Sequence, residues 1–162
     1  MKKAALAAAN QIQEYRLPSK KILILFSSGN NGGDGVFIGS FLQKKGYQVE
    51  LIDVLPKKKK TRLLEKALQD SDLQNSSSIN EIEIELHKIT IIDAVFGIGG
   101  RHILNDELKK LMRFVNDAAV KIAIDIPTGV CSDSEKKDDD AFAADYTITF
   151  IGYKIGQILG KS

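Results

Sequence analysis

Glycines and oxygen-bearing side chains gather at four places along this chain, each directly after an apolar run. The densest cluster is "GNNGGDG", residues 29–35, which follows "KILILF". The other three are "DAVFGIGGRH" at 93–102, "DIPTG" at 125–129 and "GYKIG" at 152–156. Parallel strands end at one edge of a sheet, and ligands bind outside that edge. We therefore expect the four clusters to meet there and to form a binding site.

The first cluster matches neither of the standard phosphate-binding motifs. The dinucleotide fingerprint G-x-G-x-x-G fails because Ile38 stands at its third glycine when the motif is read from Gly33, and no Gly-Lys-Ser/Thr follows as in a P-loop. A glycine-rich turn into a helix still brings main-chain N–H groups close to an anion. Asp34 would repel a phosphate, so its side chain either caps the helix, binds ribose hydroxyls or balances a cation.

Oxygen ligands for a hard cation stand in the same clusters. Asn30 and Asn31 offer side-chain carbonyl oxygens. Asp93, at the end of the neighbouring predicted strand, could add a carboxylate oxygen. Such a set suits potassium, which we expect as a possible ligand of this edge.

Candidates for proton transfer follow the later strands. Pro127 favours an extended exit from the strand that ends near Asp125. A carboxylate in a partly dry crevice has a raised pKa and can act as acid or base; alternatively, Asp125 caps its own turn. Lys154 follows the last strand and is either a site residue or a surface lysine. Arg101 fits a phosphate clamp, and His102 lies beside it.

Alternating apolar and amphipathic stretches predict an α/β fold with a parallel sheet covered on both faces. The predicted strands are residues 21–26, 47–54, 89–97, 120–127 and 145–152. The predicted helices are an N-terminal one with Leu6, Ala9 and Ile12 on one face, then 36–46, the later part of 57–69, and 105–117 with Asn105 as N-cap. Residues 72–80 form a polar loop, and 81–86 form either an edge strand or the end of a connection.

The composition is that of an ordinary globular domain. Of the 162 residues, 43% are hydrophobic and 27% are charged, and the net charge is +2. We therefore expect no nucleic-acid and no membrane partner. The basic run Lys57–Lys60 fits a solvated turn. Polar residues interrupt the N-terminal alanines too early for a signal peptide, and the single cysteine excludes an intrachain disulfide, so we expect a cytoplasmic protein.

The four clusters together resemble the NAD(P)H-hydrate epimerases, the YjeF N-terminal domain family. The resemblance rests on the segments "GNNGGDG", "IIDAVFGIGG", "IAIDIPTGV" and "ADYTITFIGYKIG", which occur in the family's order and spacing. It implies a Rossmann-like three-layer α/β/α sandwich with a mostly parallel central sheet. It also implies an enzyme that interconverts the R and S forms of hydrated NADH and NADPH, so that a partner dehydratase, separate or fused, can restore the cofactor. A homodimer is a further expectation.

The resemblance implies roles for individual residues. Ligand binding falls to Asn30, Asn31, Gly32, Gly33 and Asp34. The residues implied to line the phosphate and ribose end of the ligand are Gly97, Ile98, Gly99, Gly100, Arg101, His102 and Ile103. The implied potassium ligands are Asn31, Asp93 and Thr128. Asp125 would contact the substrate and is the first candidate for acid–base chemistry, and Lys154 is the second.

Departures from the family pattern leave other readings open. Family members usually have further segments at both ends, so we expect residues 1–162 to be a single domain, shortened at both ends. Thr128 replaces the commoner serine, and "SDSEKKDDDAF" at 132–142 is unusually charged. The first alternative is a non-catalytic nucleotide- or protein-binding module of the same fold. The second is an NAD-dependent dehydrogenase, for which Asp53 would be the acid at the end of the second strand.

Overall fold

A six-stranded sheet forms the centre of the part of the chain that the computed structural model describes, residues 2–76, 85–98 and 103–150. Neighbouring strands run parallel throughout this sheet, in the order β3-β2-β1-β4-β5-β6. The strands are β1 (Lys21–Phe26), β2 (Gln48–Asp53), β3 (Gln74–Ser76), β4 (Thr90–Ala94), β5 (Val120–Ile124) and β6 (Tyr146–Ile148). The order reverses between β1 and β4, which is where ligands bind in folds of this kind.

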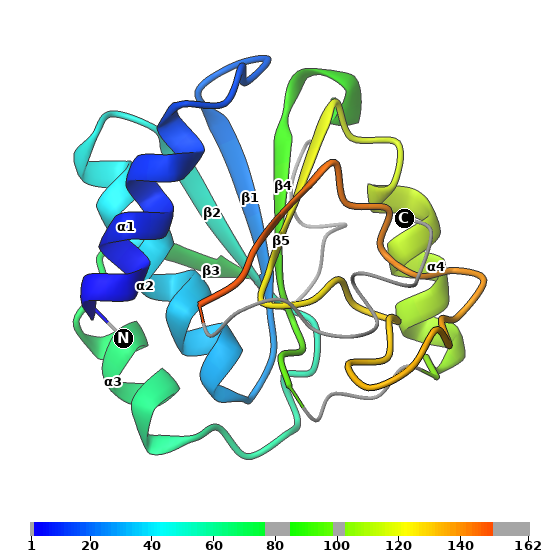
Figure 1. Cartoon of the computed structure of the whole chain (residues 1–162). Helices are drawn as coiled ribbons and strands as arrows, with labels where there is room; N and C mark the ends of the chain where they lie inside the picture. Colours follow the sequence, from blue (N-terminus) through cyan, green and yellow to red (C-terminus); the bar gives the residue numbers. More distant parts are fainter. Residues whose placement is uncertain (1, 77–84, 99–102, 151–162) are drawn as a thin grey trace.

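Helices cover both faces of the sheet (Figure 1). They are α1 (Lys2–Gln13), α2 (Asn30–Lys44), α3 (Arg62–Gln69) and α4 (Asp106–Val115), with a 3-10 turn at Leu86–Lys88. The first three helices lie on one face, and α4 lies on the other with the segment that follows β5 (Figure 1). The expected Rossmann-like, three-layer α/β/α fold is therefore confirmed.

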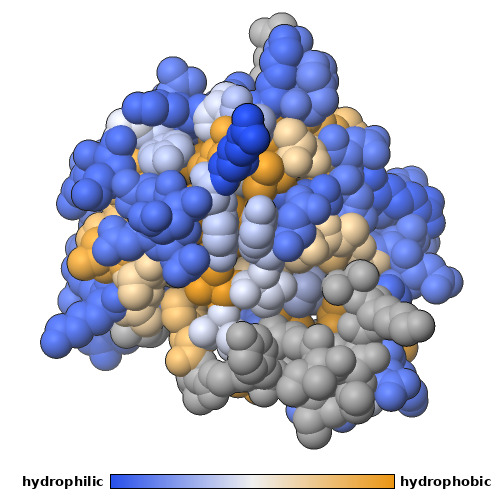
Figure 2. All heavy atoms as spheres, turned by 45° about the horizontal axis from the view of Figure 1, so that its top comes forward, coloured by the Kyte–Doolittle hydropathy of each residue, from blue (hydrophilic) through white to orange (hydrophobic). Residues whose placement is uncertain are grey.

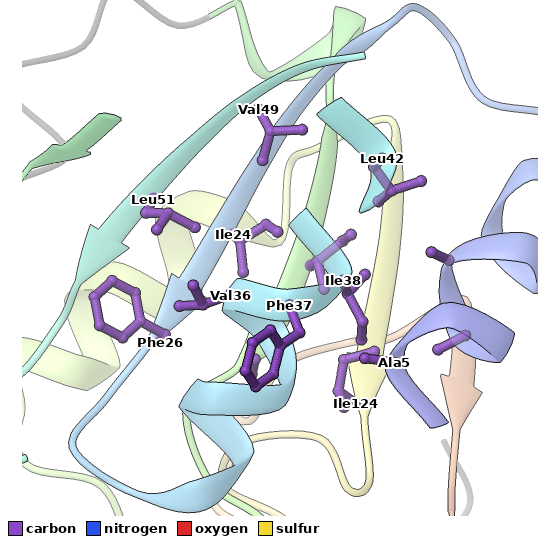
Figure 3. Close-up of a cluster of buried hydrophobic side chains, with 14 of the residues drawn as sticks. Ala5, Ile24, Phe26, Val36, Phe37, Ile38, Leu42, Val49, Leu51 and Ile124 are labelled. Atoms are coloured by element: carbon purple, nitrogen blue, oxygen red, sulfur yellow. The ribbon is translucent and has the colours of Figure 1, made fainter. Parts of the chain in front are cut away.

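Strand β1 shows why these aliphatic runs form buried strands. Successive side chains of a strand point to opposite faces. Ile22, Ile24 and Phe26 accordingly belong to the core beneath α1 and α2, whereas Leu23 and Leu25 belong to the core beneath α4. Figure 3 shows the first of these cores, with side chains of α2 packed over β1. A strand buried on both faces needs no polar alternation.

Glycines form part of the contact between helix α2 and the sheet. A Cβ atom added at Gly35 would lie 2.5 Å from the Cβ of Ala94 on β4, and one at Gly39 would lie 2.8 Å from the Cδ1 of Ile24 on β1. A larger residue at Gly35 would push the helix away from β4, because the Cβ of Ala94 cannot rotate aside. Part of the glycine content of the first cluster therefore serves helix–sheet packing.

The structure corrects several predicted boundaries. Helix α2 begins at Asn30, so "NNGGDG" forms its first turns and is not a loop before a helix at Val36. Residues 74–76, predicted as part of a polar loop, form the edge strand β3. On α1, Leu6 is exposed, and Ala5, Ala8, Ala9 and Ile12 are the buried residues. Most of the ambiguous segment 81–86 lies outside the described residues.

The helix termini and the surface agree with the remaining predictions. Asn105 caps α4 by accepting a hydrogen bond from the Leu108 N–H, and Thr61 caps α3 in the same way. The face drawn in Figure 2 is mostly hydrophilic, with apolar residues visible in narrow strips between charged flanks. Within the described ranges, none of the helices has both the length and the apolar character that crossing a bilayer requires.

Candidate active site

The candidate site lies at the carboxyl ends of β1, β4 and β5, which are neighbours in the sheet. The first turn of α2 connects them. The Nδ2 amide of Asn31 donates one hydrogen bond to the carbonyl of Phe96 after β4 (2.8 Å) and a second to the carbonyl of Ile124 at the end of β5 (3.1 Å). With both N–H groups used in this way, the Oδ1 atom remains as an acceptor for a ligand.

Two neighbouring residues hold this turn in place. The buried hydroxyl of Ser27 donates a 2.6 Å hydrogen bond to the carbonyl of Val95, which ties the end of β1 to the end of β4. A Cβ atom added at Gly32 would overlap the carbonyl oxygen of Ser27, so the turn tolerates only glycine there. Ser27 was not among the predicted site residues, and its only sequence signal is its position directly after the strand.

Asp125 reaches across the site from the end of β5. Its φ of 70° places it in the left-handed region, which aspartate adopts more readily than most residues. Its Oδ2 atom accepts a 2.9 Å hydrogen bond from the N–H of Ile98, in the connection after β4. A Cβ atom at Gly97 would lie only 2.9 Å from that same oxygen, so glycine leaves room for the carboxylate. This contact bridges two connections, whereas a turn cap would act within its own turn.

Asp93 and Thr128 form a buried pair at the same edge, and neither is accessible to solvent. Oδ2 of Asp93 accepts a 2.7 Å hydrogen bond from the N–H of Thr128, and Oδ1 accepts one of 2.8 Å from the Thr128 hydroxyl and one of 3.0 Å from the N–H of Val95. Burial raises the pKa of Asp93 to about 6, although these three hydrogen bonds favour the ionised form.

The chemistry of this pair fits a hard cation. Among the described residues, none of the basic side chains forms a salt bridge with Asp93, so its buried carboxylate lacks a positive partner. Asn31 Oδ1, the Asp93 carboxylate and the Thr128 oxygens are the hard ligands that such ions prefer. The described part of the chain contains no group of three His, Cys, Asp or Glu side chains that could hold a metal. The available ligand set is therefore mainly neutral oxygen.

Asp34 lies in the second turn of α2, and one of its carboxylate oxygens is unusual. Oδ1 is buried and accepts no hydrogen bond within the described structure. Burial, with a smaller contribution from the negative charge of Asp125, raises the pKa of Asp34 to about 6. Capping, one of the three roles considered for Asp34, is wrong, because Gly29 occupies the N-cap position.

The structure brings together six of the predicted site residues: Asn31, Asp93, Gly97, Ile98, Asp125 and Thr128. Asn30 is exposed at the start of α2. Gly33 packs against α3, where an added Cβ would lie 3.5 Å from the Cα of Leu64, and Ile103 is 69% exposed. Five predicted residues, Gly99, Gly100, Arg101, His102 and Lys154, lie outside the described residues.

The acid expected of a dehydrogenase has another role here. Asp53 ends β2, but its Oδ2 atom lies 2.6 Å from the ammonium group of Lys60 and its Oδ1 accepts a hydrogen bond from the N–H of Leu55. The carboxylate that would bind ribose in a dehydrogenase is thus committed to an internal ion pair. Lys60, assigned to a solvated turn from the sequence, is instead the partner of this buried aspartate.

Comparison with known proteins shows what the chain is similar to. The chain is similar to the bifunctional NAD(P)H-hydrate repair enzyme Nnr of Dictyoglomus turgidum, with 36% identity over 86% of this chain, but it spans only 28% of that protein. It is also similar to the NAD(P)H-hydrate epimerase of Oenococcus oeni, at 29% identity over 98% of this chain and 76% of the relative. For the epimerase of Limosilactobacillus reuteri the corresponding values are 30%, 96% and 74%.

A solved structure shares the fold. The crystal structure of the yeast protein ynu0 (YNL200c) superposes with a TM-score of 0.75 over 98% of this chain and 70% of that one, at 18% identity. The profile of one protein family, described as "YjeF-related protein N-terminus", matches residues 1–156. That match covers nearly the whole chain, and the chain therefore belongs to the YjeF-related N-terminal family.

Proposed function

We propose that this chain is an NAD(P)H-hydrate epimerase, which interconverts the R and S forms of hydrated NADH and NADPH. The observation that carries the proposal is the hydrogen-bonded network at the carboxyl edge, in which Asn31 and Asp125 join the connections after β4 and β5. The relatives named as epimerases support the choice of reaction. The failed dinucleotide fingerprint and the Asp53–Lys60 ion pair argue against a dehydrogenase.

Epimerisation requires that the hydrated ring carbon lose its configuration. Either its carbon–oxygen bond breaks and re-forms on the other face, or the ring opens and closes again. In the first route an acid protonates the hydroxyl group, and water leaves with the electron pair of the bond. The ring nitrogen stabilises the resulting cation with its lone pair. Water then adds to the opposite face and gives up a proton to a base.

Two carboxyl groups of the site can carry out these proton transfers, one as the acid and the other as the base. Asp125 comes first, since its carboxylate is anchored at the edge by the Ile98 N–H and sits where the connections meet. Asp34, with a pKa of about 6, keeps a protonated fraction near neutral pH and can supply the acid. Lys154, the other candidate for acid–base chemistry, lies outside the described residues.

We also propose that potassium binds between α2 and the Asp93–Thr128 pair. Asn31 Oδ1, the carboxylate of Asp93 and an oxygen of Thr128 would hold it. When bound, potassium supplies a fixed positive charge beside an anionic dinucleotide. The support is the buried Asp93 carboxylate, which accepts three hydrogen bonds but has no basic partner among the described side chains.

The reaction defines the partners. Because the Dictyoglomus relative is named as a bifunctional repair enzyme, we propose that an NAD(P)HX dehydratase, separate or fused, consumes the product. Cytoplasmic location and a homodimer belong to the same proposal.

A coupled assay tests the proposed reaction. The R epimer of hydrated NADPH is supplied with an S-specific dehydratase, its nucleotide and potassium, and the recovery of NADPH absorbance is followed. We expect the chain to accelerate recovery over the spontaneous rate, and Asp125→Asn to abolish the acceleration. Asp117→Asn, at an exposed position near the end of α4, is the matched control. No acceleration by a folded protein in the presence of active dehydratase would overturn the proposal.

A further inference from the structure

The side chain of a fourth aspartate, Asp138, is buried close to the candidate site, although the residue belongs to the charged segment 132–142. Its side chain is only 5% exposed. Its Oδ2 atom accepts a 3.0 Å hydrogen bond from the N–H of Leu104, just before α4, and lies 3.5 Å from the ammonium group of Lys109. Its Oδ1 atom accepts a hydrogen bond of 3.1 Å from the N–H of Asp140. Both carboxylate oxygens are therefore engaged.

The main chain around Asp138 is attached to the turn after β5. The N–H of Asp138 donates a 2.8 Å hydrogen bond to the carbonyl of Gly129, and the N–H of Phe142 donates one of 2.8 Å to the carbonyl of Thr128. Thr128 is the residue that donates two hydrogen bonds to Asp93. Asp138 thus lies between the Thr128–Gly129 turn, to which its backbone is bonded, and Leu104, to which its side chain is bonded.

Two carboxylates hold the two ends of the connection from β4 to α4. Asp125 accepts a hydrogen bond from the N–H of Ile98, near the start of this connection. Asp138 accepts one from the N–H of Leu104, at the end of the connection. Both aspartates come from the connection between β5 and β6. The connection between β5 and β6 therefore fixes the position of both described ends of the connection between β4 and α4.

We propose that Asp138 is a positioning residue for ligand binding, whose carboxylate holds Leu104 against the Thr128–Gly129 turn and so sets the separation of the two connections that face the ligand. The inference deepens the proposed function and rests on it for the identity of the ligand. Asp138 itself does not touch the reacting atoms. Burial raises its pKa, but the Leu104 and Asp140 N–H groups and the charge of Lys109 lower it by more, so the side chain is an ionised acceptor at neutral pH.

Other contacts keep this segment in place without the Asp138 side chain. Arg113 donates two hydrogen bonds to the carboxylate of Asp140, at 2.6 and 2.7 Å. The side chain of Asn116 donates a hydrogen bond to the carbonyl of Ala141 (3.1 Å) and accepts one from the N–H of Ala143 (2.8 Å). Truncation of Asp138 should consequently release Leu104 while the segment stays folded against α4.

The test measures ligand affinity and the mobility of one amide in the same variants. NADPH binding is measured by calorimetry, and KM and kcat for hydrated NADPH by the coupled assay. We expect Asp138→Ala to raise Kd and KM by about tenfold, the equivalent of one hydrogen bond to a charged group, and to leave kcat within about twofold. Hydrogen exchange at the Leu104 amide should accelerate in the same variant.

Three further variants separate positioning from stability. Asp138→Asn keeps a side-chain oxygen for the Leu104 N–H, so it should restore most of the affinity and the slow exchange. Lys109→Gln removes the ion pair but leaves the hydrogen bond to Leu104, so it should lower stability without changing Kd. Asp139→Ala alters the exposed neighbour of Asp138 and serves as the control.

The outcomes distinguish the two claims. A wild-type chain that binds NADPH without epimerising the hydrate would overturn the proposed reaction. The role of Asp138 would still be decided by the ratio of the Kd values for NADPH of Asp138→Ala and wild type. If Asp138→Ala accelerates exchange at Leu104 yet binds NADPH as tightly as wild type does, Asp138 has no positioning role. Equal losses of affinity in Asp138→Ala and Lys109→Gln would also overturn it, because the effect would then follow stability.

Discussion

Replacing Asn31 by aspartate changes one N–H₂ group into an oxygen at the centre of the site. In the native protein this amide donates hydrogen bonds to the carbonyls of Phe96 and Ile124, at 2.8 and 3.1 Å. The variant side chain has nearly the same size and shape. An ionised carboxylate, however, cannot donate, and it would place negative charge against two carbonyl oxygens and near the carboxylates of Asp34 and Asp125.

The size of the effect follows from the lost bonds. Each hydrogen bond contributes about 1 kcal/mol net, and the two carbonyls are left facing an acceptor, so we expect Asn31→Asp to lower the free energy of unfolding by about 2–3 kcal/mol. For a domain of this length that corresponds to a fall in Tm of about 4–12 °C. Urea unfolding at pH 7.5, followed by circular dichroism, measures the change directly.

The preceding residue provides a matched control. Asn30→Asp makes the same chemical change at an exposed position in the first turn of α2. Negative charge near a helix N-terminus is favourable, so this variant should be neutral or slightly more stable than wild type. A loss of less than about 0.5 kcal/mol in Asn31→Asp, or equal losses in the two variants, would refute the bridging role of Asn31.

Three further perturbations test other parts of the account. Gly35→Ala should cost about 1–3 kcal/mol, because its Cβ would lie 2.5 Å from that of Ala94, whereas Gly33→Ala, with no atom nearer than 3.5 Å, should be neutral or stabilising in urea unfolding. The pKa of Asp34, raised to about 6, means that its native carboxyl group binds a proton more tightly than the unfolded one, so wild type loses stability as the pH rises from about 4 to about 6. Asp34→Asn should therefore be about 1 kcal/mol more stable than wild type at pH 7.5, a value reduced because Asp34 is partly exposed. At or below pH 4 the variant should have no advantage. An equal advantage at both pH values would contradict the raised pKa of Asp34. Potassium should raise the Tm of wild type more than sodium does, and Asp93→Asn should remove the difference in a thermal-shift measurement.

Much of this site could be expected from the sequence because strand topology places it. Asp93 and Asp125 each follow a mostly aliphatic run, and parallel strands bring their carboxyl ends to one edge. Thr128 is three residues beyond Asp125 and lies beside Asp93, because the strands that precede these residues end at the same edge. The resemblance to a known family added the pairing of these residues with one cation.

The parts that could not be predicted depend on tertiary contacts. The segment "NNGGDG" has poor helix propensity, yet it is helical because Gly35 lies against Ala94 and Gly32 against Ser27, where only glycine fits. Residues 74–76 look like a loop, but the edge of β2 offers them main-chain hydrogen bonds. Asp138 stands among other charged residues, and nothing in that pattern distinguishes the one that turns inward to Leu104.

The most direct test of the central claim is to follow the two epimers themselves. Pure R-form hydrated NADPH is incubated with the protein in potassium buffer, without any dehydratase, and the R and S forms are separated by chromatography over time. We expect the wild-type chain to bring the mixture to equilibrium much faster than buffer alone does, and Asp125→Asn, still folded, not to do so. If the wild-type chain leaves the R form to epimerise at the spontaneous rate, or if Asp125→Asn is fully active, the assignment of this site to epimerisation through Asp125 is wrong.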